Sequence, residues 1–237
     1  MSKKILCIIP ARKNSKGIKN KNLYKVNNKP LIYYTLKQAV EIQKKIDIYI
    51  HISTDNKKIL SYAKQEFNIS CDYLRPKIIS GDKSSMVSTV LHSLNWLKKK
   101  KLNFDSVLLL QPTNPVRLSK EILKAISIFK KKNLISLMSV TNVREHPYEI
   151  VNIKNKKWKY LIKRNFKYVA RQFFDKNYYF IDGSIYLSKV SFLKKYKNFV
   201  IKDKTKLFFL NRSRPIDIDY YDDLPIAEFF LKKFNIK

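Results

Sequence analysis

The alternation of short apolar runs with amphipathic segments constrains this chain more than any other feature. Five apolar runs have the length and character of buried strands: 5–11, 47–55, 69–74, 106–110 and 134–140. The stretches between them place apolar residues at helical spacing, over 30–45, 56–67, 85–101 and 119–131. Such alternation favours an α/β fold with a mostly parallel sheet. Ligands of these sheets bind at the carboxyl ends of the strands, so the loops after the first, second and fourth strands are the first candidates for a site.

The second half of the chain departs from this rhythm. Over residues 144–181, polar and aromatic residues mix without clean periodicity, which indicates an insertion within a single domain that spans 1–237. Beyond it the pattern predicts extended segments and helices in turn, over 183–188, 190–196, 206–210, 216–220 and 224–234. Ser119 is the expected N-cap of its helix, and Asp222 and Asp223 are expected to cap the last one.

The net charge of +32, from 50 basic and 18 acidic residues, would ordinarily point to a nucleic-acid-binding protein. Lysine is nonetheless spread almost evenly and accompanies abundant Ile, Asn, Tyr and Phe, which favours a coding bias toward A·T-rich codons over a basic binding surface. No apolar run is long enough to span a bilayer, and Arg12 and Lys13 interrupt the first one. Two distant cysteines and three distant histidines favour neither a disulfide framework nor a zinc site, so we expect a cytoplasmic protein.

Glycine is scarce enough to be informative. Average usage of about 7% would give roughly 17 glycines in a chain of this length, but there are only three: Gly17, Gly81 and Gly183. Each is therefore expected where the backbone needs a positive φ or where a Cβ would not fit.

The loop after the first strand combines guanidinium, hydroxyl, ammonium and backbone N–H groups around a glycine, which suits a triphosphate. Its candidate phosphate contacts are Arg12, Ser15, Lys16, Gly17, Lys21 and Asn22. The loop lacks the G-x-x-x-x-G-K-[ST] pattern of a Walker A motif, and a solvated basic turn is the alternative interpretation.

Two further stretches could carry chemistry. In an extended segment Asp217 and Asp219 would lie on one face, with Ile218 on the other, and two carboxylates so close need a counter-charge such as Mg²⁺ bound to phosphate oxygens. In the run after the fourth strand, two prolines bracket polar residues and indicate a rigid loop, from which Gln111 would point into the cleft.

Six runs occur in an order that resembles the CMP-N-acylneuraminate synthetases (acylneuraminate cytidylyltransferases), and they cover essentially the whole chain: IIPARKNSKGIKNKNL, ISTDN, YLRP, LLLQPTNPVR, DGSIYL and IDIDYYDDL. The resemblance implies a three-layer, Rossmann-like fold of the nucleotide-diphospho-sugar transferase kind. It also implies transfer of CMP from CTP to the anomeric hydroxyl of a nine-carbon 2-keto sugar acid, with Mg²⁺ and release of pyrophosphate. The insertion would then pack against a partner subunit in a homodimer, and its aromatic residues fit such an interface: Trp158, Tyr160, Phe166, Phe173 and Phe174.

The resemblance also assigns roles. The expected catalytic residues are Arg12, Lys21, Asp217 and Asp219, of which the two aspartates would hold Mg²⁺. The expected nucleotide contacts are Arg12, Ser15, Lys16, Gly17, Lys21, Asn22 and, near the cytidine, Arg75. Gln111, Asp182 and Gly183 would face the sugar, and Arg171 would reach its carboxylate.

This sequence departs from the family pattern at a few positions, which are Lys13 and Asn14 where relatives often have glycine, Met86 near a serine position, and Asp182 in place of asparagine. These departures leave open whether the sugar is neuraminic, legionaminic or another nonulosonic acid, and no general base is identified. Two other functions stay open at this stage, a related sugar nucleotidyltransferase and a basic nucleic-acid-binding protein.

Overall fold

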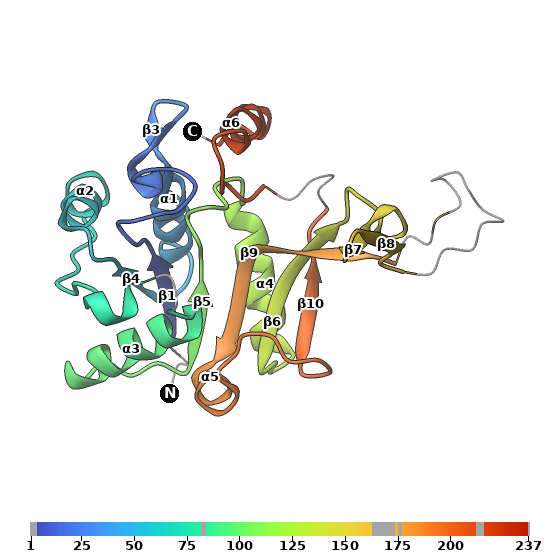
Figure 1. The fold of residues 1–237 in the computed structure, drawn as a ribbon. Helices are drawn as coiled ribbons and strands as arrows, with labels where there is room; N and C mark the ends of the chain where they lie inside the picture. The colour runs from blue at the N-terminus through green and yellow to red at the C-terminus, as the bar shows by residue number, and fades with distance from the viewer. Residues whose placement is uncertain (1–3, 82–83, 163–173, 175–176, 212–215, 237) are drawn as a thin grey trace.

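A six-stranded sheet forms the centre of the molecule (Figure 1), in the strand order β10-β6-β9-β5-β1-β4. The structure is a computed structural model that describes residues 4–81, 84–162, 174, 177–211 and 216–236. The strands are β1 (Ile5–Pro10), β4 (Ile48–Ser53), β5 (Ser106–Leu109), β6 (Ser136–Asn142), β9 (Tyr179–Lys189) and β10 (Thr205–Phe209). Only β9 runs antiparallel to its neighbours, and the other pairs are parallel. The predicted mostly parallel sheet is therefore confirmed.

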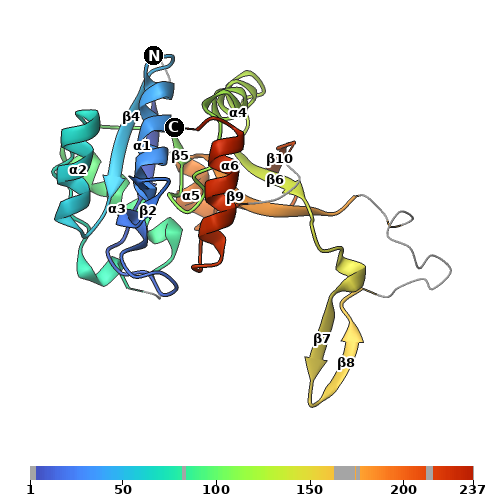
Figure 2. The same ribbon diagram turned by 90° about the horizontal axis from the view of Figure 1, so that it is seen from above.

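Helices cover both faces of the sheet and make three layers, as Figures 1 and 2 show. One face packs against α1 (Leu31–Gln43), α2 (Lys57–Phe67) and α4 (Ser119–Lys131), and the other against α3 (Met86–Lys99) and α5 (Val190–Tyr196). Alternate residues of β1 enter the two cores, which explains why its run is almost wholly apolar. In the ranges that the structure describes, no helix has the length and apolar character needed to cross a bilayer.

A third, smaller core joins the loop after β1 to the last segments of the chain. We call it the terminal cluster, and its buried members are Ile18, Val26, Leu31, Tyr34, Val116, Ile216, Ile218, Leu224, Ala227 and Leu231. They come from the loop after β1, the short hairpin of β2 (Lys25–Val26) and β3 (Lys29–Pro30), helix α1, the loop after β5 and the last helix, α6 (Asp223–Lys233). The terminal cluster therefore holds the basic N-terminal loop and the acidic C-terminal segment on one side of the sheet.

One predicted strand does not form, and the predicted extended segment 216–220 does not join the sheet. Residues 69–74 contribute only an isolated parallel bridge between Leu74 and Thr54, because the segment meets the chain just beyond the end of β4. Residues 216–220 pair with no strand. Their backbone is extended beside a loop, and the Ile218 N–H donates to the Thr113 carbonyl at 2.8 Å.

The expected helix caps also differ in detail. Leu118, not Ser119, is the N-cap of α4, and the Glu121 carboxylate accepts the Leu118 N–H at 3.0 Å. The Asp222 side chain makes no cap bond. Asp223 instead turns back, and its carboxylate accepts the N–H groups of residues 219 and 220. In both helices an acid in the first turn accepts N–H groups of residues that precede the helix.

The predicted insertion leaves the body of the molecule as a projecting hairpin (Figure 2). It contains a short 3-10 turn, η3 (Pro147–Glu149), and two antiparallel strands, β7 (Val151–Lys154) and β8 (Lys157–Tyr160). Strand β9 begins at Tyr179, so its first residues lie inside the predicted insertion and return the chain directly to the sheet.

Strand β4 places a histidine in an apolar environment. His51 is 1% exposed, and in the described part of the chain its Nε2 has no hydrogen-bond partner. Its ring lies 4.9 Å from that of Tyr73 and 5.9 Å from that of Trp96, measured between ring centroids. Burial lowers the pKa of His51 to about 4.

We expect this histidine to destabilise the fold in mild acid. The unfolded chain takes up a proton near pH 6.5, whereas the folded chain does not until about pH 4, so the contribution of His51 is present above pH 6.5 and is lost as the pH falls toward 4. Between pH 7 and pH 5 the free energy of unfolding should fall by about 2 kcal/mol more in the wild type than in His51→Leu. Urea unfolding of both proteins at the two pH values measures this difference, and an equal pH dependence would contradict it.

Candidate active site

A cavity of about 540 Å³ opens at the carboxyl ends of β1, β4 and β5. It brings together most of the predicted site residues: Arg12, Ser15, Lys16, Gly17, Lys21, Asn22, Arg75, Gln111 and Asp219. Four of these side chains are cationic and one is a carboxylate, so the lining is strongly positive. A cavity of this size and charge fits a polyanionic small molecule.

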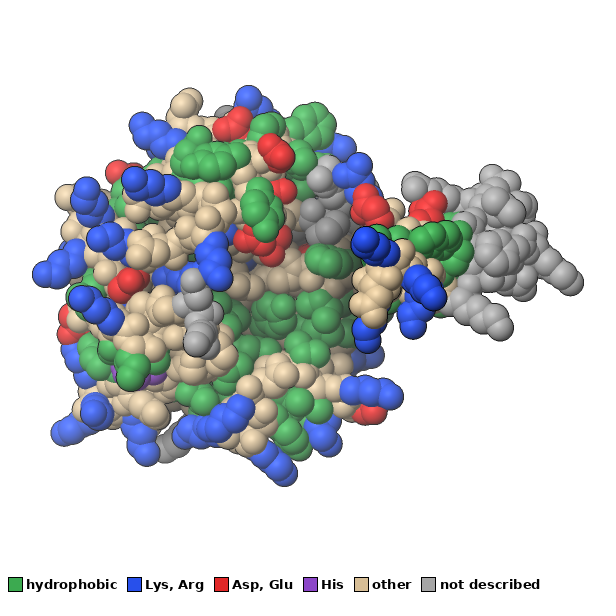
Figure 3. Space-filling view, viewed as in Figure 1, with side chains coloured by type: hydrophobic (Ala, Val, Ile, Leu, Met, Phe, Trp, Pro, Cys, Tyr) green, Lys and Arg blue, Asp and Glu red, His purple; other side chains and the backbone are tan. Residues whose placement is uncertain are grey.

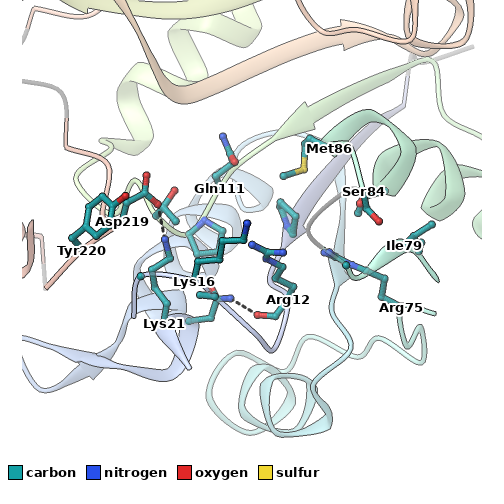
Figure 4. Close-up of a pocket in the computed structure, with 18 residues that line it drawn as sticks. Arg12, Lys16, Lys21, Arg75, Ile79, Ser84, Met86, Gln111, Asp219 and Tyr220 are labelled. Atoms are coloured by element: carbon teal, nitrogen blue, oxygen red, sulfur yellow. Dashed lines mark hydrogen bonds and ion pairs between the residues drawn. The ribbon is translucent and has the colours of Figure 1, made fainter. Parts of the chain in front are cut away.

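Hydrogen bonds fix the backbone of the basic loop and the side chain of Arg75. The N–H of Lys13 donates to the Asp55 carboxylate at 2.6 Å, and the Asn22 amide donates to the Arg12 carbonyl at 2.9 Å, which closes the loop after β1. Arg75 is 6% exposed and donates from Nε to the Ser53 hydroxyl at 3.1 Å and from Nη2 to the Ser53 carbonyl. Burial lowers the pKa of Arg75 from its ordinary value. Figure 4 shows Arg12 and Arg75 facing the same space.

Lys21 connects the basic loop to the acidic segment at the wall of the cavity (Figure 4). Its Nζ donates to the Ile218 carbonyl at 2.7 Å and to Asp219 Oδ1 at 2.8 Å. Its side chain is only 10% exposed, whereas that of Asp219 is 63% exposed. The ion pair is therefore half sheltered, and it fixes the acidic segment against the basic loop.

The three glycines differ in whether they need a positive φ or the absence of a Cβ. A Cβ on Gly17 would lie 2.0 Å from the Asp219 carbonyl oxygen, so the missing side chain allows the basic loop to touch the acidic segment. Gly183 has a φ of 69° beside the irregular pairing of β9 with β6. For Gly81 the expectation is wrong, because it has no positive φ and a Cβ there would meet no atom within 4 Å.

We expect Gly17→Ala to separate the two halves of the site. The new methyl group would push Asp219 away from Lys21, and a displacement of about 1 Å in a catalytic group can cost about a hundredfold in rate. The measurement is kcat/KM for CTP, with the rate monitored as release of pyrophosphate. Gly81→Ala is the comparison because Gly81 also lines the cavity, but a Cβ there would meet no protein atom within 4 Å. An equal loss in both variants would contradict the assigned role of Gly17.

The predicted metal-binding pair lies on one side of the acidic segment. Ile216 and Ile218 point into the terminal cluster, while Asp217 and Asp219 point outward, as the alternation predicted. The Asn114 amide donates to Asp217 Oδ1 at 3.2 Å. Burial raises the pKa of the Asp217 carboxyl, and the nearby charge of Asp219 raises it further.

These acids fit a magnesium ion. Mg²⁺ prefers oxygen ligands and is typically held by one or two carboxylates together with substrate phosphates. Within the described residues no cluster of three or more acidic, histidine or cysteine ligands forms, so a closed all-protein site is not available there. Asp219 lines the cationic cavity, whereas Asp217 lies against Asn114 and is not part of the lining. Two neighbouring carboxylates so placed are the kind of donor set that needs a phosphate to complete it.

Only one of the side chains predicted to contact the sugar lines the cavity in the described part of the chain. The Gln111 side chain lines the cavity and lies 3.4 Å from the Gly183 carbonyl, to which its amide donates. Asp182 does not line the cavity. It is 1% exposed, and its carboxylate accepts hydrogen bonds from the Ser139 and Ser184 hydroxyls and the Ser184 N–H. Arg171 lies outside the described residues.

The structure adds residues that the sequence did not single out for the site. Thr113 and Tyr220 line the cavity, the latter beside Asp219. Met86, which the sequence marked as a departure from the family pattern, lines it from the start of α3. Asn114 and Arg117 lie behind it, each 1% exposed. Position in the quoted runs was the one available signal for Thr113, Asn114, Arg117 and Tyr220, since nothing in their residue type marks them as functional.

Comparison with known proteins agrees with this geometry. The cytidylyltransferase family model matches residues 6–236. A CMP-N,N'-diacetyllegionaminic acid synthase from Legionella pneumophila is 32% identical over 95% of this chain and 95% of its own length. A post-translational flagellin modification protein B from Campylobacter coli is 30% identical over 98% and 97%, respectively. An N-acylneuraminate cytidylyltransferase from Escherichia coli is 27% identical over 99% of this chain, which spans 54% of that longer relative.

The fold is also shared with a solved structure. CMP:2-keto-3-deoxy-manno-octonic acid synthetase in complex with CTP matches with a TM-score of 0.69, at 15% identity and over 98% of this chain and 99% of that one. The sequence matches confirm the resemblance to the CMP-N-acylneuraminate synthetases. The chain belongs to the cytidylyltransferase family and is a nucleotidyltransferase of the CMP-acylneuraminate synthetase type.

Proposed function

We propose that this protein activates a nonulosonic acid with CTP, giving the CMP-sugar and pyrophosphate. The observation that carries the proposal is the shared cavity, in which the basic loop after β1 faces the acidic segment before α6. A relative that matches nearly the whole chain is by name a synthase of a CMP-sugar acid, CMP-N,N'-diacetyllegionaminic acid. We place the reaction in the cytoplasm, where CTP is made.

The proposed reaction is an in-line displacement at the α-phosphorus of CTP. The anomeric hydroxyl of the sugar acid gives up its proton to water as its oxygen forms a bond to phosphorus. The bond from phosphorus to the bridging oxygen of the β-phosphate breaks, and pyrophosphate leaves with the electrons of that bond. Arg12, Lys16 and Lys21 offset the charge that develops on the phosphate oxygens, and Arg75 orients the nucleotide from the end of β4. Gln111 faces the incoming sugar from the other side of the cavity.

Enzymes of this family typically use a divalent metal ion. Asp217 and Asp219 would hold it here. A bound Mg²⁺ would neutralise phosphate charge and favour departure of pyrophosphate. Lys21 keeps Asp219 at the cavity wall, and the acidic segment is thereby ready to meet a phosphate that the basic loop has bound.

A substrate panel tests the proposal. Purified protein is supplied with CTP and Mg²⁺ and with N-acetylneuraminic, legionaminic, pseudaminic or 2-keto-3-deoxy-manno-octonic acid, and pyrophosphate release and CMP-sugar formation are followed. We expect turnover with a nine-carbon acid. Turnover only with another class of sugar, or with another nucleotide in place of CTP, would replace the proposed substrate by that one.

The high charge has a different explanation from nucleic-acid binding. Figure 3 shows lysine and arginine side chains scattered over this face rather than gathered in one stripe. A protein that binds nucleic acid through such charges would lose affinity steeply with salt and would be insensitive to changes at Asp219. The family match and the cationic cavity lined by the predicted site residues favour the enzyme instead.

We further propose a homodimer that buries the projecting hairpin. Ile153 and Trp158 are 72% and 62% exposed on the hairpin, and Phe180 and Phe209 lie exposed nearby on the sheet. Figure 3 shows apolar side chains gathered beside the projecting segment. Phe174, expected at the interface, is buried instead in its own chain against His146. Light scattering should give about twice the chain mass of 28.2 kDa, and a monomeric mass would contradict the dimer.

A further inference from the structure

A line of buried polar side chains ends at Asp217. Asn114, in the loop after β5, is 1% exposed, and its Nδ2 donates to Asp217 Oδ1 at 3.2 Å. On its other side, Asn114 Oδ1 lies 3.2 Å from the Ser184 hydroxyl of β9, whose one proton is shared between Asn114 Oδ1 and Asp182 Oδ2. An amide that joins a strand to a carboxylate in this way restricts both its own rotation and that of its acceptor.

The strand end of this line is itself fixed. The Ser184 hydroxyl also lies 2.8 Å from Asp182 Oδ2, and the Ser184 N–H donates to Asp182 Oδ1 at 3.1 Å. The Ser139 hydroxyl of β6 donates to the same carboxylate and accepts the N–H of Ile185 at 2.9 Å. Two strands of the central sheet therefore support the position of Asn114.

Asp217 lies on a segment that is not part of the sheet. The segment meets the loop after β5 through the backbone hydrogen bond from Ile218 to Thr113, and Asn114 is the next residue of that loop. The second carboxylate oxygen of Asp217 faces Gly183, since a Cβ on that glycine would lie 3.8 Å from Oδ2. The bond from Asn114, together with a hydrogen bond from the Thr113 side chain, thus sets the orientation of the Asp217 carboxylate.

We propose that Asn114 is a positioning residue that holds the Asp217 carboxylate in the orientation needed to bind the divalent cation, with Ser184 and Asp182 holding Asn114 in turn. The inference rests on the proposed function, in which Asp217 is a cation ligand. Groups that hydrogen-bond to a metal ligand without touching the metal commonly change metal affinity by about 10- to 100-fold when they are removed.

The first test is the Mg²⁺ concentration that gives the half-maximal rate at saturating CTP. Asn114→Ala should raise it by about 10- to 100-fold. Val107→Ala is the matched control because Val107 lies in β5, the strand that leads into the same loop, and is fully buried, but packs in the core under α3 and α5. It should leave the Mg²⁺ requirement unchanged. Ser184→Ala, which removes only the hydroxyl beside Asn114, should shift it in the same direction by a smaller factor, and it serves if Asn114→Ala does not fold.

The second test does not depend on turnover. The melting temperature is measured with CTP and EDTA, and again with CTP and Mg²⁺. In the wild type, Mg²⁺ should add to the stabilisation by CTP, whereas in Asn114→Ala the CTP effect should remain and most of the Mg²⁺ increment should be lost. A wild-type increment in Asn114→Ala, or an equal loss in Val107→Ala, would overturn the inference.

These two tests separate the inference from the proposed function. If the wild type transfers CMP to no sugar of the panel, the proposed function fails, yet the Mg²⁺ increment in melting temperature still reports on Asn114. If transfer is normal and Asn114→Ala keeps the wild-type Mg²⁺ requirement, the inference alone fails.

Discussion

Asp219→Asn is expected to lower kcat for CMP transfer by about a thousandfold while the fold stays intact. Asparagine keeps the volume of the side chain and the oxygen that accepts the Lys21 ammonium at 2.8 Å. It removes the negative charge that would help to hold a divalent cation beside the triphosphate. Because Lys21 is then left without its counter-charge, its attraction for the phosphates should increase, and the KM for CTP should not rise.

The measurement combines steady-state kinetics with a thermal melt. Asp222→Asn is the matched control, since Asp222 is exposed, lies only three residues further along and loses the same charge. We expect the control to retain nearly the wild-type rate. A rate for Asp219→Asn within tenfold of the wild type would remove Asp219 from the reaction, and a large fall in melting temperature would assign it to the fold instead.

Arg117→Met is expected to cost about 3 to 5 kcal/mol of unfolding free energy, the largest stability effect that we predict. The Arg117 guanidinium is 1% exposed and donates to four acceptors. They are Thr35 Oγ1 at 2.6 Å, Gln38 Oε1 at 3.1 Å, the Gln111 carbonyl at 2.8 Å and the Ser184 carbonyl at 3.1 Å. Methionine fills much of the volume but satisfies none of them, and each buried acceptor left unpaired costs about 1 to 3 kcal/mol.

Urea unfolding at pH 7 measures this loss. Arg144→Met provides the control, because the Arg144 side chain is 55% exposed and its ion pair with Glu145 is a surface contact that contributes little. We expect that variant to change the free energy of unfolding by less than about 0.5 kcal/mol. A loss below about 1 kcal/mol for Arg117→Met would mean that water or rearranged side chains satisfy the four acceptors.

The sequence predicted what depends on local pattern. The apolar run of β1 and the helical spacing of α1, α3 and α4 indicated the layers, because burial on one or two faces leaves a direct periodic trace. The alternation around Ile218 correctly placed Asp217 and Asp219 on one side even though no strand forms there. The period of two follows from extended backbone, and it does not require a strand partner.

What the sequence could not show depends on distant contacts. Residues 69–74 have the composition of a strand, but they meet the sheet only at its very edge, through Leu74. Arg117 reads as a surface arginine until the fold surrounds it with carbonyl groups. Asn114 reads as a loop residue because its partners lie about 70 and 100 positions away. Neither residue type nor spacing carries that information.

The terminal cluster forms late in synthesis of the chain on the ribosome. All six strands of the sheet are complete by Phe209, whereas the acids at 217 and 219 and the helix that buries Ile218 follow later in translation. A nascent chain can therefore assemble its scaffold and its basic loop while the opposite wall of the cavity does not yet exist. Without the residues that follow Phe209, the basic loop has neither its acidic partner at Asp219 nor the apolar residues that hold it in place.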